Sequence, residues 1–134
     1  MDLKKAVSQS YKNLWPLPAT TVLVSCVGNT SVPNIITIGA CGIASARPPL
    51  ISLAFGTRQY SLELVKETGD FAVNIPSNRQ VFITDWCGRV SGRHHDKFKE
   101  QNLTPGKSLK IKSPYISECP VNYECTLWKI VNCG

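Results

Sequence analysis

Short segments rich in β-branched residues, each bounded by proline, glycine or asparagine, are the feature that most restricts how this chain can fold. Four of them occupy residues 21–27, 34–41, 50–55 and 71–75. Their composition favours β-strands. Residues 28–30, Gly-Asn-Thr, have the composition of a turn, so the first two segments are expected to pair as a hairpin.

Two further strands are expected in the second half of the chain. Leu109 and Ile111 alternate with two lysines, a pattern typical of a half-exposed strand. Residues 121–127 place four apolar side chains on one face of a last, longer strand. A strand that ends the sequence would leave an unpaired edge, so either another chain covers that edge or the natural protein is longer.

Two short helices are predicted from capping and helix-breaking residues. Residues 2–14 fit an amphipathic helix that two prolines, at positions 16 and 18, would end. Ser61 is expected to cap a helix over residues 62–67, and Gly69 is expected to end it.

A third helix, and with it the fold class, follows from the rest of the pattern. Ser77 and Gln80, three residues apart, predict a capping box at the start of a helix over about 78–87. About six strands and two or three short helices therefore suit one domain spanning residues 1–134. Short strands separated by turns favour a barrel or a sandwich over a doubly wound sheet. The fold class is predicted to be mainly β.

The net charge of +6 favours an anionic ligand or partner. The basic residues are scattered and lack the aromatic motif of an RNA-binding sheet, so nucleic-acid binding is not expected. No apolar run approaches the roughly 18 residues that a membrane span needs. The polar start of the chain also lacks the apolar core of a signal peptide. We therefore expect a cytoplasmic protein that does not bind membranes.

The cysteines and histidines predict neither disulfides nor a metal site. Without a secretory signal, the six cysteines are expected to be free thiols. No C-x-x-C pair occurs, and the spacing of the last three cysteines is unlike that of common structural zinc sites. His94 and His95 are adjacent in a polar loop over residues 91–96 and are interpreted as solvated.

Nearly every side chain from residue 39 to residue 46 is small. Such a tract lets the backbone approach a flat ring system and offer it N–H and C=O groups. Close packing of strands inside a small barrel is the alternative explanation. No G-x-G-x-x-G, P-loop or G-x-S-x-G pattern occurs, so dinucleotide folds, P-loop chemistry and nucleophile elbows lose their main sequence evidence.

Five stretches, in order along the chain, resemble the FMN-binding split-barrel family, which includes flavin reductases and flavoredoxins. They are NIITIGACGIASARPPLISLAF (34–55), YS (60–61), GDFAVNIP (69–76), SGRHHDKF (91–98) and SECPVNYEC (117–125). The resemblance implies a Greek-key split β-barrel with two or three short helices that forms a homodimer. Members of the family extend further at the C-terminus, so this chain is expected to lack the C-terminal part of the barrel.

The resemblance also implies an FMN site at the subunit interface. Carried over by position, the residues lining the flavin are Asn34, Thr37, Ala40, Cys41, Gly42 and Ser45. Ser61 would contact the phosphate or its neighbourhood, where a helix N-terminus favours an anion, and Lys97 would face the ribityl-phosphate end or the ring edge. A plain helix cap at Ser61 and a solvated charge at Lys97 are the alternatives. Asn74 is expected to bond to backbone groups rather than to flavin.

The function that the resemblance implies is an FMN-dependent oxidoreductase of the flavin reductase type. Such a protein passes electrons from NAD(P)H through the flavin to free flavin or to a redox protein. Because the flavin supplies the redox chemistry, no catalytic acid–base triad is expected. A flavoredoxin-like electron-transfer protein without its own substrate turnover is the second hypothesis. A truncated, flavin-free barrel with a binding or structural role is the third.

Overall fold

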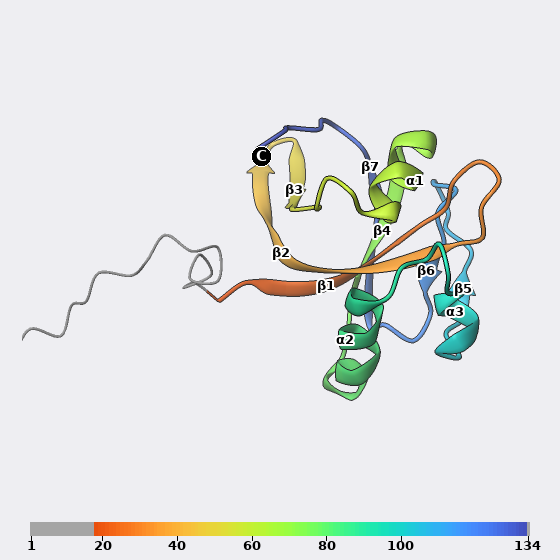
Figure 1. Cartoon of the computed structure of the whole chain (residues 1–134). Coiled ribbons are helices and arrows are strands. Elements are labelled where there is room, and N and C mark those ends of the chain that lie inside the picture. The colour runs from red at the N-terminus through yellow and green to blue at the C-terminus, as the bar shows by residue number, and fades with distance from the viewer. Residues whose placement is uncertain (1–17, 134) are drawn as a thin grey trace, which may run out of the picture.

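The computed structural model of the chain describes residues 18–133. A five-stranded antiparallel sheet forms the centre of the molecule, and three α-helices and a small two-stranded sheet surround it (Figure 1). No helix in this part of the chain is long and apolar enough to cross a membrane. The helix predicted over residues 2–14 lies outside the described residues.

The described strands and helices agree with most of the sequence-based expectations. The large sheet contains β1 (Thr20–Cys26), β2 (Asn34–Ala46), β3 (Pro49–Leu53), β4 (Asp70–Ile75) and β7 (Val121–Thr126). The small sheet contains β5 (Pro105–Gly106) and β6 (Tyr115–Ile116). The helices are α1 (Tyr60–Thr68), α2 (Val81–Arg89) and α3 (Lys97–Glu100), and the 3-10 turn η2 (Asn78–Gln80) leads into α2. The four early strands, the last strand and the hairpin of β1 with β2 are confirmed.

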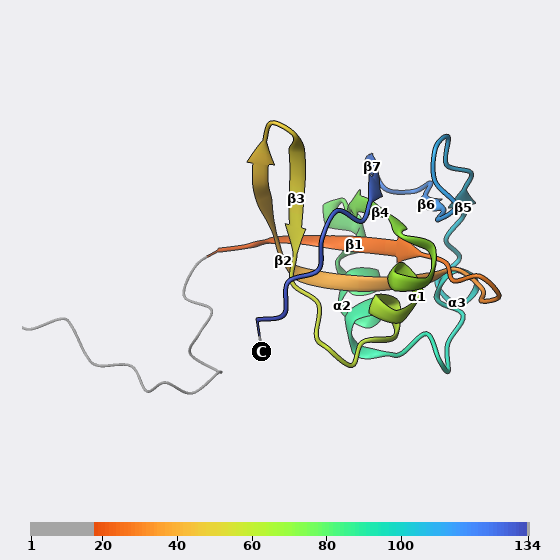
Figure 2. The same cartoon turned by 90° about the horizontal axis from the view of Figure 1, so that it is seen from above.

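The long strand β2 divides the sheet into two parts. The strand order is β3-β2-β1-β4-β7; the first half of β2 pairs with β1, and its second half pairs with β3. Thr20 pairs with Cys41 but Val22 pairs with Ile38, so β2 contains one residue more than β1 in this interval. Such a bulge bends a strand. The hairpin of β2 with β3 accordingly stands away from β1 (Figure 2).

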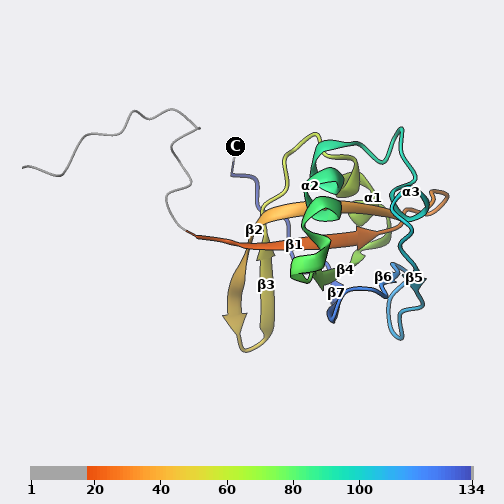
Figure 3. The ribbon, with the colours of Figure 1, turned by 90° about the horizontal axis from the view of Figure 1, so that it is seen from below.

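Both faces of the sheet are covered. Alternate residues of each strand face opposite sides of the sheet, so one strand contributes to both cores. Val22 and Val24 of β1 belong to the core that packs against α1. Leu23, between them, belongs to a second core with Ile35 of β2 and Cys87 of α2. Figure 3 shows α2 lying across β1 and β2 on the second face. The first half of β2 is therefore held between the two helical layers.

The end of α1 and the start of α2 follow the predicted signals. Gly69 ends α1 with a φ of 73°, in the left-handed region, and its N–H donates to the carbonyl of Val65 at 2.8 Å. Before α2, the N–H of Ser77 donates to Oε1 of Gln80 at 2.7 Å, as the capping-box pattern predicts.

Two sequence-based predictions are wrong. Ser61 is not the cap of α1, because the helix begins at Tyr60 and the Ser61 side chain is buried within the first turn. The residues around Leu109 and Ile111 form a loop rather than a strand. Backbone amides of this loop donate to the carboxylates of Glu124 and Asp70, so they need no strand partner.

All six cysteines are free thiols. Burial raises the pKa of Cys26 to about 12 and that of Cys87 to about 11, which keeps both thiols protonated at neutral pH. Within residues 18–133, no three His, Cys, Asp or Glu side chains gather where they could hold a metal ion.

Asn74 connects four strands from a fully buried position on β4. Its Nδ2 donates to the carbonyl of Leu23 and to Oγ of Ser25, both at 3.0 Å, on β1. Its Oδ1 accepts from the N–H of Ile116 on β6 at 2.9 Å and from Nδ2 of Asn122 on β7 at 2.8 Å. Asn74 thus bonds to backbone groups, as expected, and also to the side chains of Ser25 and Asn122.

We expect Asn74→Ala to lower the free energy of unfolding by about 3 kcal/mol, because each buried polar group left without a partner costs about 1–3 kcal/mol. Asn78→Ala is the matched control, since Asn78 is exposed on η2, and it should change stability by less than about 0.5 kcal/mol. Urea unfolding followed by tryptophan fluorescence measures both. Equal losses would contradict the role assigned to Asn74.

Candidate functional site

A hollow of about 220 Å³, here the small hollow, lies where the N-terminus of α1, the end of α2 and the start of β2 meet. Three cationic residues line it, Arg58, Arg89 and Lys97, and its lining within residues 18–133 contains no carboxylate. Arg89 forms an ion pair with Asp85 at 3.0 Å on the exposed side of α2. Among the described residues, no carboxylate forms an ion pair with Arg58 or Lys97. The hollow is therefore positively charged and suits an anion.

The N-terminus of α1 adds to this positive charge. The residue that precedes the helix, Gln59, makes no side-chain capping bond to the first turn. Uncapped amides and the helix dipole both favour an anion at this end. Arg93 holds the neighbouring loop against the helix, because it lies 4.6 Å from the ring centre of Tyr60 and pairs with Glu63 at 2.5 Å.

Asn34 places an unsatisfied acceptor at the small hollow. The residue is only 3% exposed, and its Nδ2 donates to Oγ of Ser61 at 2.8 Å. Its Oδ1 is buried and has no hydrogen-bond partner among the described residues. A Cβ at Gly92 would come within 2.2 Å of this oxygen, so only glycine fits beside it. Buried acceptors are rarely left unpaired, so Oδ1 indicates where a ligand hydroxyl or N–H can donate.

Lys97 is buried, with 2% of its surface exposed. Its Nζ donates to the carbonyl of Ile35 on β2 at 2.6 Å and to the carbonyl of Cys87 on α2 at 2.7 Å. Burial lowers the pKa of the ammonium, although thiolates at Cys87 and Cys26 would oppose that effect. These contacts exclude a solvated charge. They tie α3 to both walls of the hollow and leave one N–H of the ammonium for a ligand.

The outer edge of the first half of β2 is open. The carbonyl of Ile35 accepts from Lys97, so it points away from β1. Peptide groups alternate in direction along an antiparallel strand, which places those of Thr37 on the same outer edge, before the bulge. Among residues 18–133, no strand pairs with this edge before the bulge. Backbone donors and acceptors are thus available to a ligand along β2.

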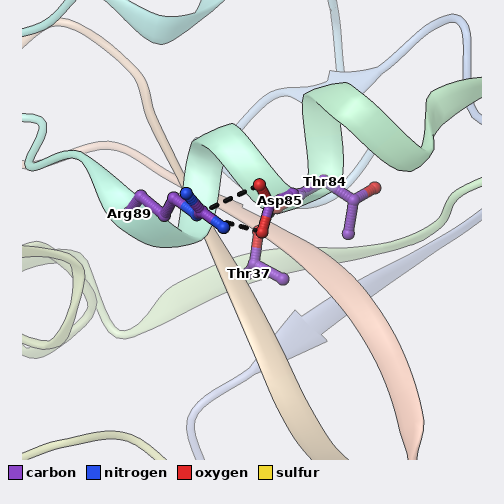
Figure 4. A network of polar contacts seen from close by, with 4 residues as sticks. All are labelled: Thr37, Thr84, Asp85 and Arg89. Carbon is purple, nitrogen blue, oxygen red and sulfur yellow. Dashed lines mark hydrogen bonds and ion pairs between the residues drawn. The ribbon is translucent and has the colours of Figure 1, made fainter.

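A second hollow of about 570 Å³, here the large hollow, lies between α2 and the strands β1 and β2. Gly88 and Arg89 line both hollows. Thr37 lines the large one and donates its Oγ1 proton to the carbonyl of Thr84 at 2.5 Å, so the hydroxyl can only accept from a ligand. Figure 4 shows this group of residues, with Arg89 reaching back along α2 to Asp85.

The structure brings together some of the predicted site residues and separates others. Asn34, Ser61 and Lys97 meet at the small hollow, and Thr37 lies at the large one. The others lie further along β2 and are half-buried or exposed: Ala40, Cys41, Gly42 and Ser45. A Cβ at Gly39 would meet nothing within 4 Å, so packing inside this chain does not require a small residue there.

Sequence reasoning missed Arg58, Arg89 and Gly92. Arg58 stands just before the first turn of α1, a position from which a cation can reach a ligand at the helix N-terminus. Gly92 lies within the stretch 91–98 that resembles the family, but its role depends on its contact with Asn34, far away in sequence. No feature of the sequence distinguishes Arg89 from the other charged residues on the surface of an amphipathic helix.

We expect Lys97→Met to lower the free energy of unfolding by about 2 kcal/mol, since each hydrogen bond from a charged group contributes about 1.5–3 kcal/mol and relief of desolvation offsets part of the loss. Lys99→Met is the matched control, because Lys99 is exposed on the same short helix. Urea titrations of the two variants and the wild type provide the comparison. A Lys97 variant as stable as the control would show that the two carbonyl contacts contribute little.

The comparisons with sequences place most of the chain in one family. The model of the family described as "Flavin reductase like domain" matches residues 15–134. An uncharacterized protein of Archaeoglobus fulgidus is 33% identical over 132 residues, which cover 98% of this chain and 72% of that protein. An uncharacterized protein of Pyrococcus abyssi is 25% identical, over 94% of this chain and 70% of its own length.

Solved structures agree with this assignment. Flavoredoxin of Desulfovibrio vulgaris (Miyazaki F) superposes with a TM-score of 0.86 at 30% identity, over 96% of this chain and 69% of that one. Flavoredoxin from Methanosarcina acetivorans gives a TM-score of 0.84 at 27% identity, over 96% of this chain and 66% of that one. The chain therefore belongs to the flavin reductase like domain family and has its split-barrel fold.

Proposed function

We propose that this chain binds FMN and is an oxidoreductase of the flavin reductase type, which passes electrons from NAD(P)H to free flavin or to a redox protein. The observation that carries the proposal is the small hollow. It combines three cationic residues, an uncapped helix N-terminus and the unpaired buried oxygen of Asn34. When bound, the flavin supplies the redox chemistry, and the chain supplies binding, orientation and charge.

The small hollow suits the phosphate and ribityl end of FMN. Arg58 and the first turn of α1 offer charge and N–H groups to the phosphate. Oδ1 of Asn34 is placed to accept from a ribityl hydroxyl. Lys97 can donate its remaining N–H to the ligand. Ser61 accepts from the amide of Asn34 and so holds that side chain in place.

The open edge of β2 suits the ring system. The backbone of Thr37 and the tract of small residues over 40–45 allow a flat ring to approach the strand closely. The large hollow beside Thr37, of about 570 Å³, offers space next to that edge. We therefore include Ala40, Cys41, Gly42 and Ser45 as residues along the ring, where a second subunit would complete the site.

An electron-transfer protein without substrate turnover is the second candidate. The two flavoredoxin structures favour it, because both superpose over nearly the whole described chain. Two assays on the flavin-loaded protein distinguish the two functions. Repeated oxidation of NADH or NADPH with free FMN as acceptor supports the reductase. Reduction by dithionite without any NAD(P)H turnover supports the electron carrier.

We expect Arg58→Gln to weaken FMN binding roughly tenfold, since loss of one charged hydrogen bond costs about 1.5 kcal/mol or more and 1.4 kcal/mol is one decade. Riboflavin lacks the phosphate, so its affinity should change less than about threefold. Arg79→Gln is the matched control, because Arg79 is exposed and lines neither hollow. Titration of both flavins, followed by fluorescence quenching, measures the dissociation constants.

The result of that titration separates the parts of the proposal. Equal losses for FMN and riboflavin in Arg58→Gln would place Arg58 at the ring rather than at the phosphate. Absence of binding of either flavin to the wild type would refute the cofactor assignment for this chain.

We also propose that the protein is a homodimer. In the described part of the chain, β7 is an edge strand, and exposed apolar residues lie on it and after it: Val121, Tyr123, Trp128, Ile130 and Val131. Exposed edges and apolar patches usually mark contact surfaces.

Light scattering after gel filtration should give about twice the monomer mass of 14.7 kDa for the wild type at micromolar concentration. Trp128→Glu should shift the protein toward the monomer, because it places a charge within the exposed apolar patch. Phe82→Glu, at an even more exposed apolar residue on α2, is the matched control and should leave the mass unchanged. A monomeric wild type would contradict the proposal.

A further inference from the structure

The loop over residues 107–112, here the lysine loop, joins the two strands of the small sheet and carries three lysines in six residues. Lys107, Lys110 and Lys112 are all exposed, and none forms an ion pair with a carboxylate of the described residues. No acidic residue occurs between Gln101 and Ser117. The loop therefore has an excess of positive charge, because its three lysines outnumber the two carboxylates, of Glu124 and Asp70, that bind its backbone.

Two carboxylates hold the lysine loop by its backbone. Oε1 and Oε2 of Glu124 accept from the amides of Leu109 and Lys110 at 2.8 and 2.7 Å. Oδ2 and Oδ1 of Asp70 accept from the amides of Lys112 and Ser113, both at 3.0 Å. Amide hydrogen bonds lower the pKa of Glu124. Four backbone bonds thus fix the loop, although its like charges repel one another.

The fixed loop exposes an apolar side chain among its lysines. Leu109 is 92% exposed, more than any other large hydrophobic residue of the described chain. Ile111, two residues on, is partly buried. An ordered loop that presents one apolar residue surrounded by cations resembles the centre and rim of a protein interface, where an apolar anchor contributes affinity and charges contribute steering.

We propose that the lysine loop is the docking surface for an acidic electron-transfer protein. This inference rests on the proposed function, because it identifies the redox protein that exchanges electrons with the flavin. A second copy of this chain does not complement the loop, because the dimer surface proposed above is apolar and the copy's own loop carries the same lysines. A membrane surface fits poorly, because a single exposed leucine buries little apolar area.

The loop lies apart from the small hollow. Asp70, which anchors it, follows the C-terminus of α1, whereas the hollow lies at the N-terminus of that helix. A nine-residue helix spans about 13 Å. Changes in the lysine loop should therefore leave flavin binding intact, which separates a test of docking from a test of the cofactor.

An acidic plant-type ferredoxin, immobilised on a biosensor surface, is a suitable probe for the full chain with and without added FMN. The test variant is Lys107→Glu with Lys110→Glu and Lys112→Glu. The matched control reverses three exposed cations elsewhere: Lys66→Glu, Arg79→Glu and Lys99→Glu. Both triple variants change the net charge equally. Leu109→Ser is a third variant that leaves the charge unchanged.

The wild type should bind the ferredoxin, with affinity falling at least tenfold between low and high salt. The lysine-loop triple variant should lose at least tenfold more affinity than the control triple variant, and Leu109→Ser should also weaken binding. Equal losses of affinity in the two triple variants would show that net charge alone explains the binding, and would overturn the proposal. Absence of wild-type binding, or tighter binding to vesicles rich in anionic lipid, would also overturn it. Titration of FMN into the same variants reports separately on the proposed function.

Discussion

The buried ammonium of Lys97 is the interaction on which the candidate site depends. Removing a charge from water is costly unless hydrogen bonds replace its hydration, and here two backbone carbonyls do so, on β2 and α2. This side chain holds β2 and α2 at the walls of the small hollow, and the hydrogen bond from Thr37 on β2 to Thr84 on α2 joins the two elements directly. The pairing of β2 with β1 sets which peptide groups face the open edge, and Lys97 binds the carbonyl of Ile35 on that edge.

Strand β2 then combines three roles that follow from its geometry. Its first half is covered by helices on both faces, its bulge near Gly39 bends the strand, and its second half pairs with β3. The open edge exists because β3 pairs only beyond the bulge. A flat ligand can approach a strand where no neighbouring strand occupies the edge, and the charged hollow lies at the beginning of that edge. The arrangement suits a long ligand with one anionic end.

Local rules predicted the elements well but failed where distant side chains replaced backbone partners. Gly69 ends α1, and Gln80 accepts from Ser77, because both contacts lie within a few residues. The loop near Leu109 alternates like a strand, yet carboxylates from β4 and β7 bind its amides instead. Ser61 has the composition of a helix cap, but its hydroxyl accepts from Asn34, 27 residues away.

The amino-acid sequence alone determined the strands of the large sheet, the hairpin and the mainly β fold class. It also determined the resemblance to the family. These features depend on composition and on the order of residues along the chain. Only the folded chain decides which residues meet. It buries Lys97, leaves Oδ1 of Asn34 without a partner among residues 18–133, and gathers Arg58 and Arg89 around one hollow. The physical reason is that burial, charge and hydrogen bonding at the site arise from contacts between segments far apart in sequence, which no local pattern encodes.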